Sequence, residues 1–129
     1  MDIKTIDGKS FLFAKTGNEL TAHSTEILAL DWIRKVQKLG AGEVVINSMN
    51  QDGMKNGYDI SLLNELSKVC TLPMIASGGA GSDDHFINVF VNTNVDGALA
   101  ASIFHNNEYS IQDIKTSLQS NKINIRTSL

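Results

Sequence analysis

Apolar residues recur along the chain in two spacings, and together they predict strands that alternate with helices. Short apolar runs of the kind found in buried strands cover residues 44–49, 72–77 and 95–100. Apolar positions three and four apart predict helices that begin near Ser24 or Thr25, at Asp59, at Asp83 and at Ser110. Repeated strand–helix units imply an α/β fold whose strands are parallel and joined by right-handed crossovers.

The two ends of the chain depart from this alternation. Residues 1–4 look like the end of a further strand, and Asp7-Gly8 before an apolar run predicts a small hairpin over about 5–14. Residues 15–25 are polar and predict a loop, and residues 121–129 show no packing pattern. Two architectures fit the order of elements: an open doubly wound sheet, or part of an eight-fold barrel. The 129 residues are about half of the roughly 250 that a whole barrel takes.

Small residues follow two consecutive strands, in Ser77-Gly78-Gly79 and in Ala100-Ala101-Ser102. Glycine lets a ligand approach the backbone closely, and exposed N–H groups at such turns bind phosphate. In barrels a phosphate often lies between the loops after the seventh and eighth strands. The sequence therefore predicts a phosphate site from two adjacent turns. The alternative is that small residues allow helices and strands to pack closely.

Two carboxylates are candidates for chemistry at the same end of the sheet. Asp52, before Gly53, follows a predicted strand at the end where barrels place catalytic groups. Its alternative role is that of a turn residue bonded to its own backbone. Asp2 follows a single residue of a further strand and carries no signal alone. The three histidines and the single Cys70 lack metal-ligand spacing, so we expect no metal site and no cofactor.

Composition excludes several classes of function. The net charge of −3 and the absence of a basic run argue against a nucleic-acid partner. No apolar run approaches the roughly 18 residues that span a bilayer. The amino terminus lacks a signal-peptide pattern and the chain has one cysteine, so we expect a cytoplasmic location with no membrane partner.

Four motifs in order closely resemble the cyclase subunit of imidazole glycerol phosphate synthase, over nearly the whole chain. They are Gly40-Ala-Gly-Glu-Val-Val-Ile-Asn-Ser-Met-Asn-Gln-Asp-Gly53, Asn56-Gly-Tyr-Asp59, Ile75-Ala-Ser-Gly-Gly-Ala-Gly81, and Asp96-Gly-Ala-Leu-Ala-Ala-Ser102 with Phe104-His105. The resemblance implies a (β/α)8 TIM barrel with outer helices, of which this chain is the carboxyl-terminal half. It would run from the end of strand 5 through helix 8 as one half-barrel domain over residues 1–129.

The resemblance also implies a reaction and its partners. A glutaminase subunit supplies ammonia that passes through the barrel. With it the cyclase converts a phosphoribulosyl-formimino carboxamide ribotide, a bisphosphorylated nucleotide, to imidazole glycerol phosphate and aminoimidazole carboxamide ribotide. Two aspartates act as general acid and base. The substrate's two phosphates are held one in each half of the barrel.

Family roles transfer to matching positions of this chain. Asp2 corresponds to the catalytic aspartate after the fifth strand, and Asp52 to a further active-site carboxylate. Asn47 would contact substrate, and Glu43 would belong to the ammonia gate unless it is merely a solvated charge before a strand. The residues that would hold a phosphate are Gly53, Ser77, Gly78, Gly79, Ala101 and Ser102.

The missing half bears on activity. The first four strands would carry the other catalytic aspartate and one phosphate site, so we expect the isolated chain to be inactive. Two alternatives stay open. One is a non-catalytic phosphate-binding half barrel that associates with itself through raw strand edges and an open apolar face. The other is a cyclase-like subunit of an amidotransferase that amidinates sugars.

Overall fold

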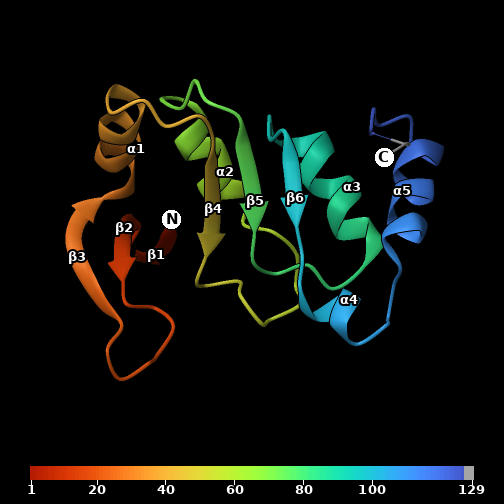
Figure 1. The fold of residues 1–129 in the computed structure, drawn as a ribbon, viewed down its shortest axis with the longest axis horizontal. Coiled ribbons are helices and arrows are strands. Elements are labelled where there is room, and N and C mark those ends of the chain that lie inside the picture. Colours follow the sequence, from red (N-terminus) through yellow and green to blue (C-terminus); the bar gives the residue numbers. More distant parts are fainter. Residues whose placement is uncertain (127–129) are drawn as a thin grey trace.

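The strands of the chain form one mixed sheet in the order β3-β2-β1-β4-β5-β6 (Figure 1). The computed structural model describes residues 1–126. The strands are β1 (Asp2–Ile6), β2 (Lys9–Ala14), β3 (His23–Leu28), β4 (Val44–Ser48), β5 (Met74–Ser77) and β6 (Gly97–Leu99). The helices are α1 (Ala29–Lys38), α2 (Ile60–Ser67), α3 (Asp83–Asn92), α4 (Ser102–His105) and α5 (Ile111–Ser120).

Strands β1, β4, β5 and β6 are parallel, and helices α2 and α3 connect the last three of them. The predicted α/β fold with a mostly parallel sheet is therefore confirmed. In β4 the buried residues Val44, Ile46 and Ser48 alternate with the partly buried Val45 and Asn47. This alternation shows that one face of the sheet is packed into the core while the other is more open.

Two predicted helix starts are confirmed by their capping contacts. The Asp59 carboxylate accepts a hydrogen bond from the backbone N–H of Leu62 at 3.0 Å and so begins α2. Ser110 and Asp113 form a reciprocal capping box at the start of α5. These contacts satisfy backbone donors that the first turn of a helix cannot pair internally.

The helix that the sequence predicts after Ser24 or Thr25 begins later, at Ala29, so that prediction is wrong. Residues 23–28, which include part of the predicted loop, form strand β3 beside β2. The hydroxyl of Thr25 donates to the carbonyl of Leu12 across the sheet at 2.8 Å instead of capping a helix. Glu26 has a φ of 61°, and the β2–β3 register shifts between Phe11 and Phe13, so a bulge hides the strand's alternation.

The amino-terminal residues complete the parallel part of the sheet. Asp2 pairs with Asn47 and Ile3 with Ser48, and Ile3 is fully buried. The rest of β1 pairs with β2 in an antiparallel hairpin, which therefore extends past the ends of the parallel strands.

The carboxyl-terminal segment packs more than its sequence predicts. Ile123 and Ile125 lie against the core, so the expectation of no packing is wrong for these two residues. Residues 127–129 of that segment lie outside the described part of the chain.

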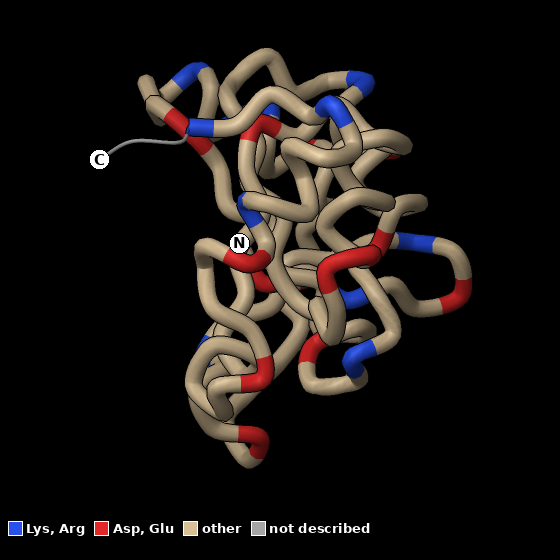
Figure 2. The backbone as a smooth tube through the Cα atoms, turned by 90° about the vertical axis from the view of Figure 1, so that its right-hand side faces the viewer, with Lys and Arg blue, Asp and Glu red and all other residues tan. Residues whose placement is uncertain are grey.

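Charges of both signs are interspersed along the backbone (Figure 2). In residues 1–126 no helix has the length and the apolar character needed to cross a membrane.

Candidate functional site

Candidate residues lie in one row across the four parallel strands, at the level where β4, β5 and β6 end. Asp2 of β1 pairs with Asn47 of β4, Asn47 pairs with Ser77 of β5, and Ser77 pairs with Leu99 of β6. Paired residues of neighbouring strands project from the same face of a sheet. The register therefore gathers, on the open face, side chains that lie up to 97 positions apart in the sequence, from Asp2 to Leu99.

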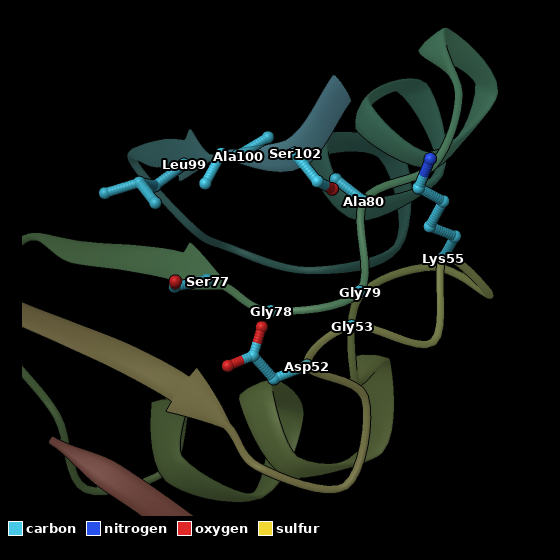
Figure 3. Close-up of a pocket in the computed structure, with 11 residues that line it drawn as sticks. Asp52, Gly53, Lys55, Ser77, Gly78, Gly79, Ala80, Leu99, Ala100 and Ser102 are labelled. Atoms are coloured by element: carbon cyan, nitrogen blue, oxygen red, sulfur yellow. The ribbon is translucent and has the colours of Figure 1, made fainter. Parts of the chain in front are cut away.

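A pocket of about 140 Å³ lies at this end of the sheet, where the segments after β4, β5 and β6 meet (Figure 3). Its lining residues are Asp52, Gly53, Lys55, Ser77, Gly78, Gly79, Ala80, Leu99, Ala100, Ala101 and Ser102. The structure thus brings together the two small-residue turns and the Asp52-Gly53 turn, as their positions after neighbouring parallel strands predict.

Several backbone N–H groups around this pocket donate no turn, loop or cap hydrogen bond to the backbone within residues 1–126. Among them are those of Gly53, Gly78, Gly79, Ala101 and Ser102. Backbone N–H groups are strong donors that ordinarily find an acceptor, whether protein, water or ligand. Unpaired donors from three separate segments at one concave site are what an anion requires.

The glycine turn also has a packing role that is independent of any ligand. Gly78 and Gly79 have φ values of 88° and 104°, which side chains rarely adopt. A Cβ atom on Gly79 would lie 2.1 Å from the carbonyl oxygen of Gly57, and one on Gly78 would lie 2.9 Å from the side chain of Asn47. Close packing therefore requires these two glycines, but the packing is against the end of β4 and the loop at Gly57 and not between a helix and a strand. It leaves their unpaired N–H groups without an explanation.

The Asn-Gly-Tyr-Asp motif ties the strand ends together. The N–H of Gly57 donates to the carbonyl of Gly79 at 2.8 Å. The hydroxyl of the buried Tyr58 donates to the carbonyl of Leu99 at 3.1 Å, and burial raises the pKa of this hydroxyl so that it stays protonated. Asp59 accepts a bond from Ser48 at 2.9 Å. One four-residue segment thereby contacts β4, β6 and the turn after β5.

Asp2 is held firmly by two donors. Its carboxylate accepts hydrogen bonds from the hydroxyl of Thr16 at 2.6 Å and from the side-chain amide of Asn47 at 2.9 Å. Burial raises the pKa of Asp2, but these bonds and the positive amino terminus outweigh burial and hold that pKa below its usual value. Asp2 is therefore ionised at neutral pH, and its carboxylate is oriented at the first residue of β1.

Asp52 occupies a different environment from Asp2. It is exposed, and its carboxylate is directed toward Gly78 at the pocket (Figure 3). The turn-residue alternative requires a bond from its side chain to nearby backbone, and the structure shows no such bond in residues 1–126. Asp2 does not line this pocket. The two aspartates are linked instead through Asn47, which bonds Asp2 and pairs with pocket residue Ser77.

Glu43 lies at the other end of β4. It precedes Val44, the first residue of that strand, and it is exposed. The full length of β4 therefore separates Glu43 from the pocket. This position places Glu43 at the amino ends of the strands.

Sequence reasoning missed several residues of the site, among them two with polar side chains, Lys55 and Thr16. Lys55 lines the pocket, and its position two residues after Gly53 was the available signal. Thr16 bonds Asp2 from the segment between β2 and β3, and no local pattern indicates that contact. Within the described residues, no three histidine, cysteine, aspartate or glutamate side chains converge as metal ligands would.

Comparison with known proteins gives one consistent match. The family model described as Histidine biosynthesis protein matches residues 2–110. A protein named imidazole glycerol phosphate synthase subunit HisF, from Buchnera aphidicola subsp. Schizaphis graminum (strain Sg), is 50% identical over 121 residues, which are 93% of this chain and 47% of the relative. Proteins of the same name show 50% identity in Aliivibrio salmonicida (strain LFI1238) and 48% in Escherichia coli O7:K1 (strain IAI39 / ExPEC). Each matches over 119 residues, 92% of this chain and 46% of the relative. The chain thus spans about half the length of these curated relatives, and the predicted resemblance is confirmed.

Proposed function

The chain belongs to the histidine biosynthesis protein family, and from that premise we propose that it supplies the carboxyl-terminal half of a (β/α)8 barrel. In this arrangement the first residues of β1 are the end of strand five, β4, β5 and β6 are strands six to eight, and α2, α3 and α5 lie outside. The parallel register from β1 to β6 supports the proposal, as does the match to about half of each relative. The hairpin of β1 and β2 is then an extension beyond the end of strand five.

The function that this geometry supports best is the cyclase step of imidazole glycerol phosphate synthesis. Ammonia from a glutaminase partner reacts with the phosphoribulosyl-formimino carboxamide ribotide. The products are imidazole glycerol phosphate and aminoimidazole carboxamide ribotide. This half contributes one catalytic aspartate and one phosphate site, and the other half contributes their counterparts.

The single observation that carries this proposal is the group of unpaired N–H groups around the pocket. One phosphate of the substrate binds Gly53, Ser77, Gly78, Gly79, Ala101 and Ser102. The substrate then extends from the pocket along the row of strand ends toward Asp2. Asp52, at the edge of the pocket, accepts a hydrogen bond from a substrate hydroxyl next to the phosphate, and Asn47 lies along the path between them.

Asp2 acts as one member of the general acid–base pair. Its lowered pKa keeps it ionised, so it accepts a proton from the attacking ammonia nitrogen and later returns one to the departing group. The hydrogen bonds from Thr16 and Asn47 fix the carboxylate's orientation before substrate arrives. Glu43, at the amino end of β4, faces the side where the glutaminase delivers ammonia.

Reassembly of the barrel from two chains tests the proposal. We expect no ammonia-dependent turnover of the carboxamide ribotide by the 129-residue chain alone, because half of the acid–base pair is absent. Adding the amino-terminal half of the Buchnera relative should restore turnover, measured as release of aminoimidazole carboxamide ribotide. Turnover by the chain alone, or none in a mixture that forms a 1:1 complex, would contradict it.

One observation favours a second candidate, a self-associating half barrel without catalysis. A largely apolar cavity of about 560 Å³ lies beside β6 and includes Phe90, Leu99 and Ile114. Sedimentation of the same mixture separates the two candidates. A pair of identical chains that excludes the amino-terminal half and binds phosphate without turnover favours this second function. A sugar-amidinating amidotransferase is tested by offering a sugar substrate in place of the carboxamide ribotide in the same assay.

A further inference from the structure

An ion pair joins two loops beside the pocket, and the proposed function does not use it. The ammonium of Lys55 contacts a carboxylate oxygen of Glu108 at 2.5 Å. Lys55 lies in the segment between β4 and α2, and Glu108 lies between α4 and α5. The two side chains are 40% and 36% exposed, so each can exchange its partner for a solvent-borne ligand.

Lys55 is the one lysine or arginine among the residues that line the pocket, and Asp52 is the one carboxylate. A phosphate monoester carries between one and two negative charges at neutral pH. The N–H groups around the pocket offer only partial charges, and Asp52 repels an anion. A fully charged donor at the rim would offset that repulsion and strengthen binding. Lys55 is the pocket residue that can supply it, although its side chain is directed away from Gly78 and Gly79 in Figure 3.

The backbone of Lys55 is fixed against the glycine turn. Its φ is 55°, and a Cβ atom on Gly81 would lie 2.5 Å from its carbonyl oxygen. The next loop is shaped in a similar way, because Asn107 has a φ of 54° immediately before Glu108. Only the flexible side chain of Lys55 can therefore turn between the carboxylate and the pocket.

Glu108 is ionised and can compete with a phosphate for the ammonium of Lys55. The hydrogen bonds from Lys55 and from the side-chain amide of Asn106 lower the pKa of Glu108, which is therefore ionised at neutral pH. A phosphate that draws the ammonium of Lys55 into the pocket must separate it from Glu108. Such a half-exposed pair is weak, so the exchange is reversible.

We propose that Lys55 is the cationic contact for the substrate phosphate and that Glu108 binds the Lys55 ammonium while the pocket is empty. Competition from Glu108 then sets how tightly the phosphate end of the substrate binds and how readily product leaves. The proposal rests on the phosphate pocket of the proposed function. It adds a specificity residue and a competing carboxylate to that pocket.

The experiment titrates the 129-residue chain with glycerol 3-phosphate as the probe and measures its dissociation constant by calorimetry. Glu108→Gln should tighten binding about two- to fivefold, the range that corresponds to one exposed ion pair. Lys55→Met should weaken it about tenfold or more, because a charge-assisted hydrogen bond is lost. In the double variant Glu108→Gln should bring no gain, because Lys55 is no longer there to be released.

Controls separate the pair from general charge effects. Glu19→Gln and Lys38→Met make the same charge changes at exposed positions outside the pocket, and each should leave the dissociation constant within about twofold. If Lys55→Met and Glu108→Gln match these controls while the chain still binds the probe, the Lys55–Glu108 proposal is wrong and the phosphate pocket stands. If neither the unmodified chain nor Glu108→Gln binds the probe, the Lys55–Glu108 proposal and the phosphate pocket are both wrong.

Discussion

Replacing Asp2 by Asn is expected to lower turnover of the reassembled two-chain enzyme by roughly 10²–10⁴-fold, the usual contribution of a general acid or base. Asparagine keeps the shape of the side chain. Its oxygen can still accept the bond from Asn47, and its NH2 group can donate to the hydroxyl of Thr16, so the site should remain assembled. What it loses is the ability to take up a proton. The measurement is kcat with saturating ammonia and carboxamide ribotide.

Two further variants test whether the loss of turnover comes from the carboxylate of Asp2. Asp7→Asn, in the exposed hairpin turn, tolerates its φ of 48° equally well and should leave kcat unchanged. Thr16→Val removes a bond to the ionised Asp2 and so raises its pKa, which should move the acidic limb of the pH–rate profile to higher pH. If Asp2→Asn retains more than a small fraction of kcat, Asp2 is not the acid or base.

Replacing Gly79 by Ala is expected to lower the free energy of unfolding of the chain by roughly 2–5 kcal/mol, the sum of a strained φ and an overpacked contact. Its φ is 104°, and the added methyl group would lie 2.1 Å from the carbonyl oxygen of Gly57. Relief requires moving the loop that carries Tyr58 and Asp59, which costs their bonds to Leu99 and Ser48. Urea unfolding followed by circular dichroism measures the loss.

Gly42 provides the matched control. No atom lies within 4 Å of a Cβ built there, and its φ lies outside the left-handed range. Gly42→Ala should therefore change the free energy of unfolding by no more than about 0.5 kcal/mol. Equal free energies of unfolding for the two alanine variants would show that the turn accepts a side chain at position 79. The described packing around Gly79 would then be wrong.

The site was predictable where it depends on strand order. Parallel strands end at one edge, so Asp52, Ser77 and Ser102 had to approach one another once the strands were located. The sequence could not reveal that Tyr58 would bond the carbonyl of Leu99, 41 residues away, because nothing local records that contact. The same holds for Lys55 and Glu108, which are 53 positions apart.

Strand β3 shows a second limit of sequence patterns. Ile27 and Leu28 fit the apolar spacing of the helix that follows, yet they belong to a strand that is stabilised by pairing with β2. Tertiary pairing overrides such local spacing. Thr16 was hidden for the same reason, because its place beside Asp2 depends on how the segment between β2 and β3 folds back.

The most direct test of the central claim follows backbone N–H groups by NMR while glycerol 3-phosphate is added to the ¹⁵N-labelled chain. The account predicts that the largest shifts occur at Gly53, Gly78, Gly79, Ala101 and Ser102, and that they saturate together with one dissociation constant. Saturable shifts centred elsewhere, or no shift at these five residues, would contradict a phosphate site at the ends of the parallel strands.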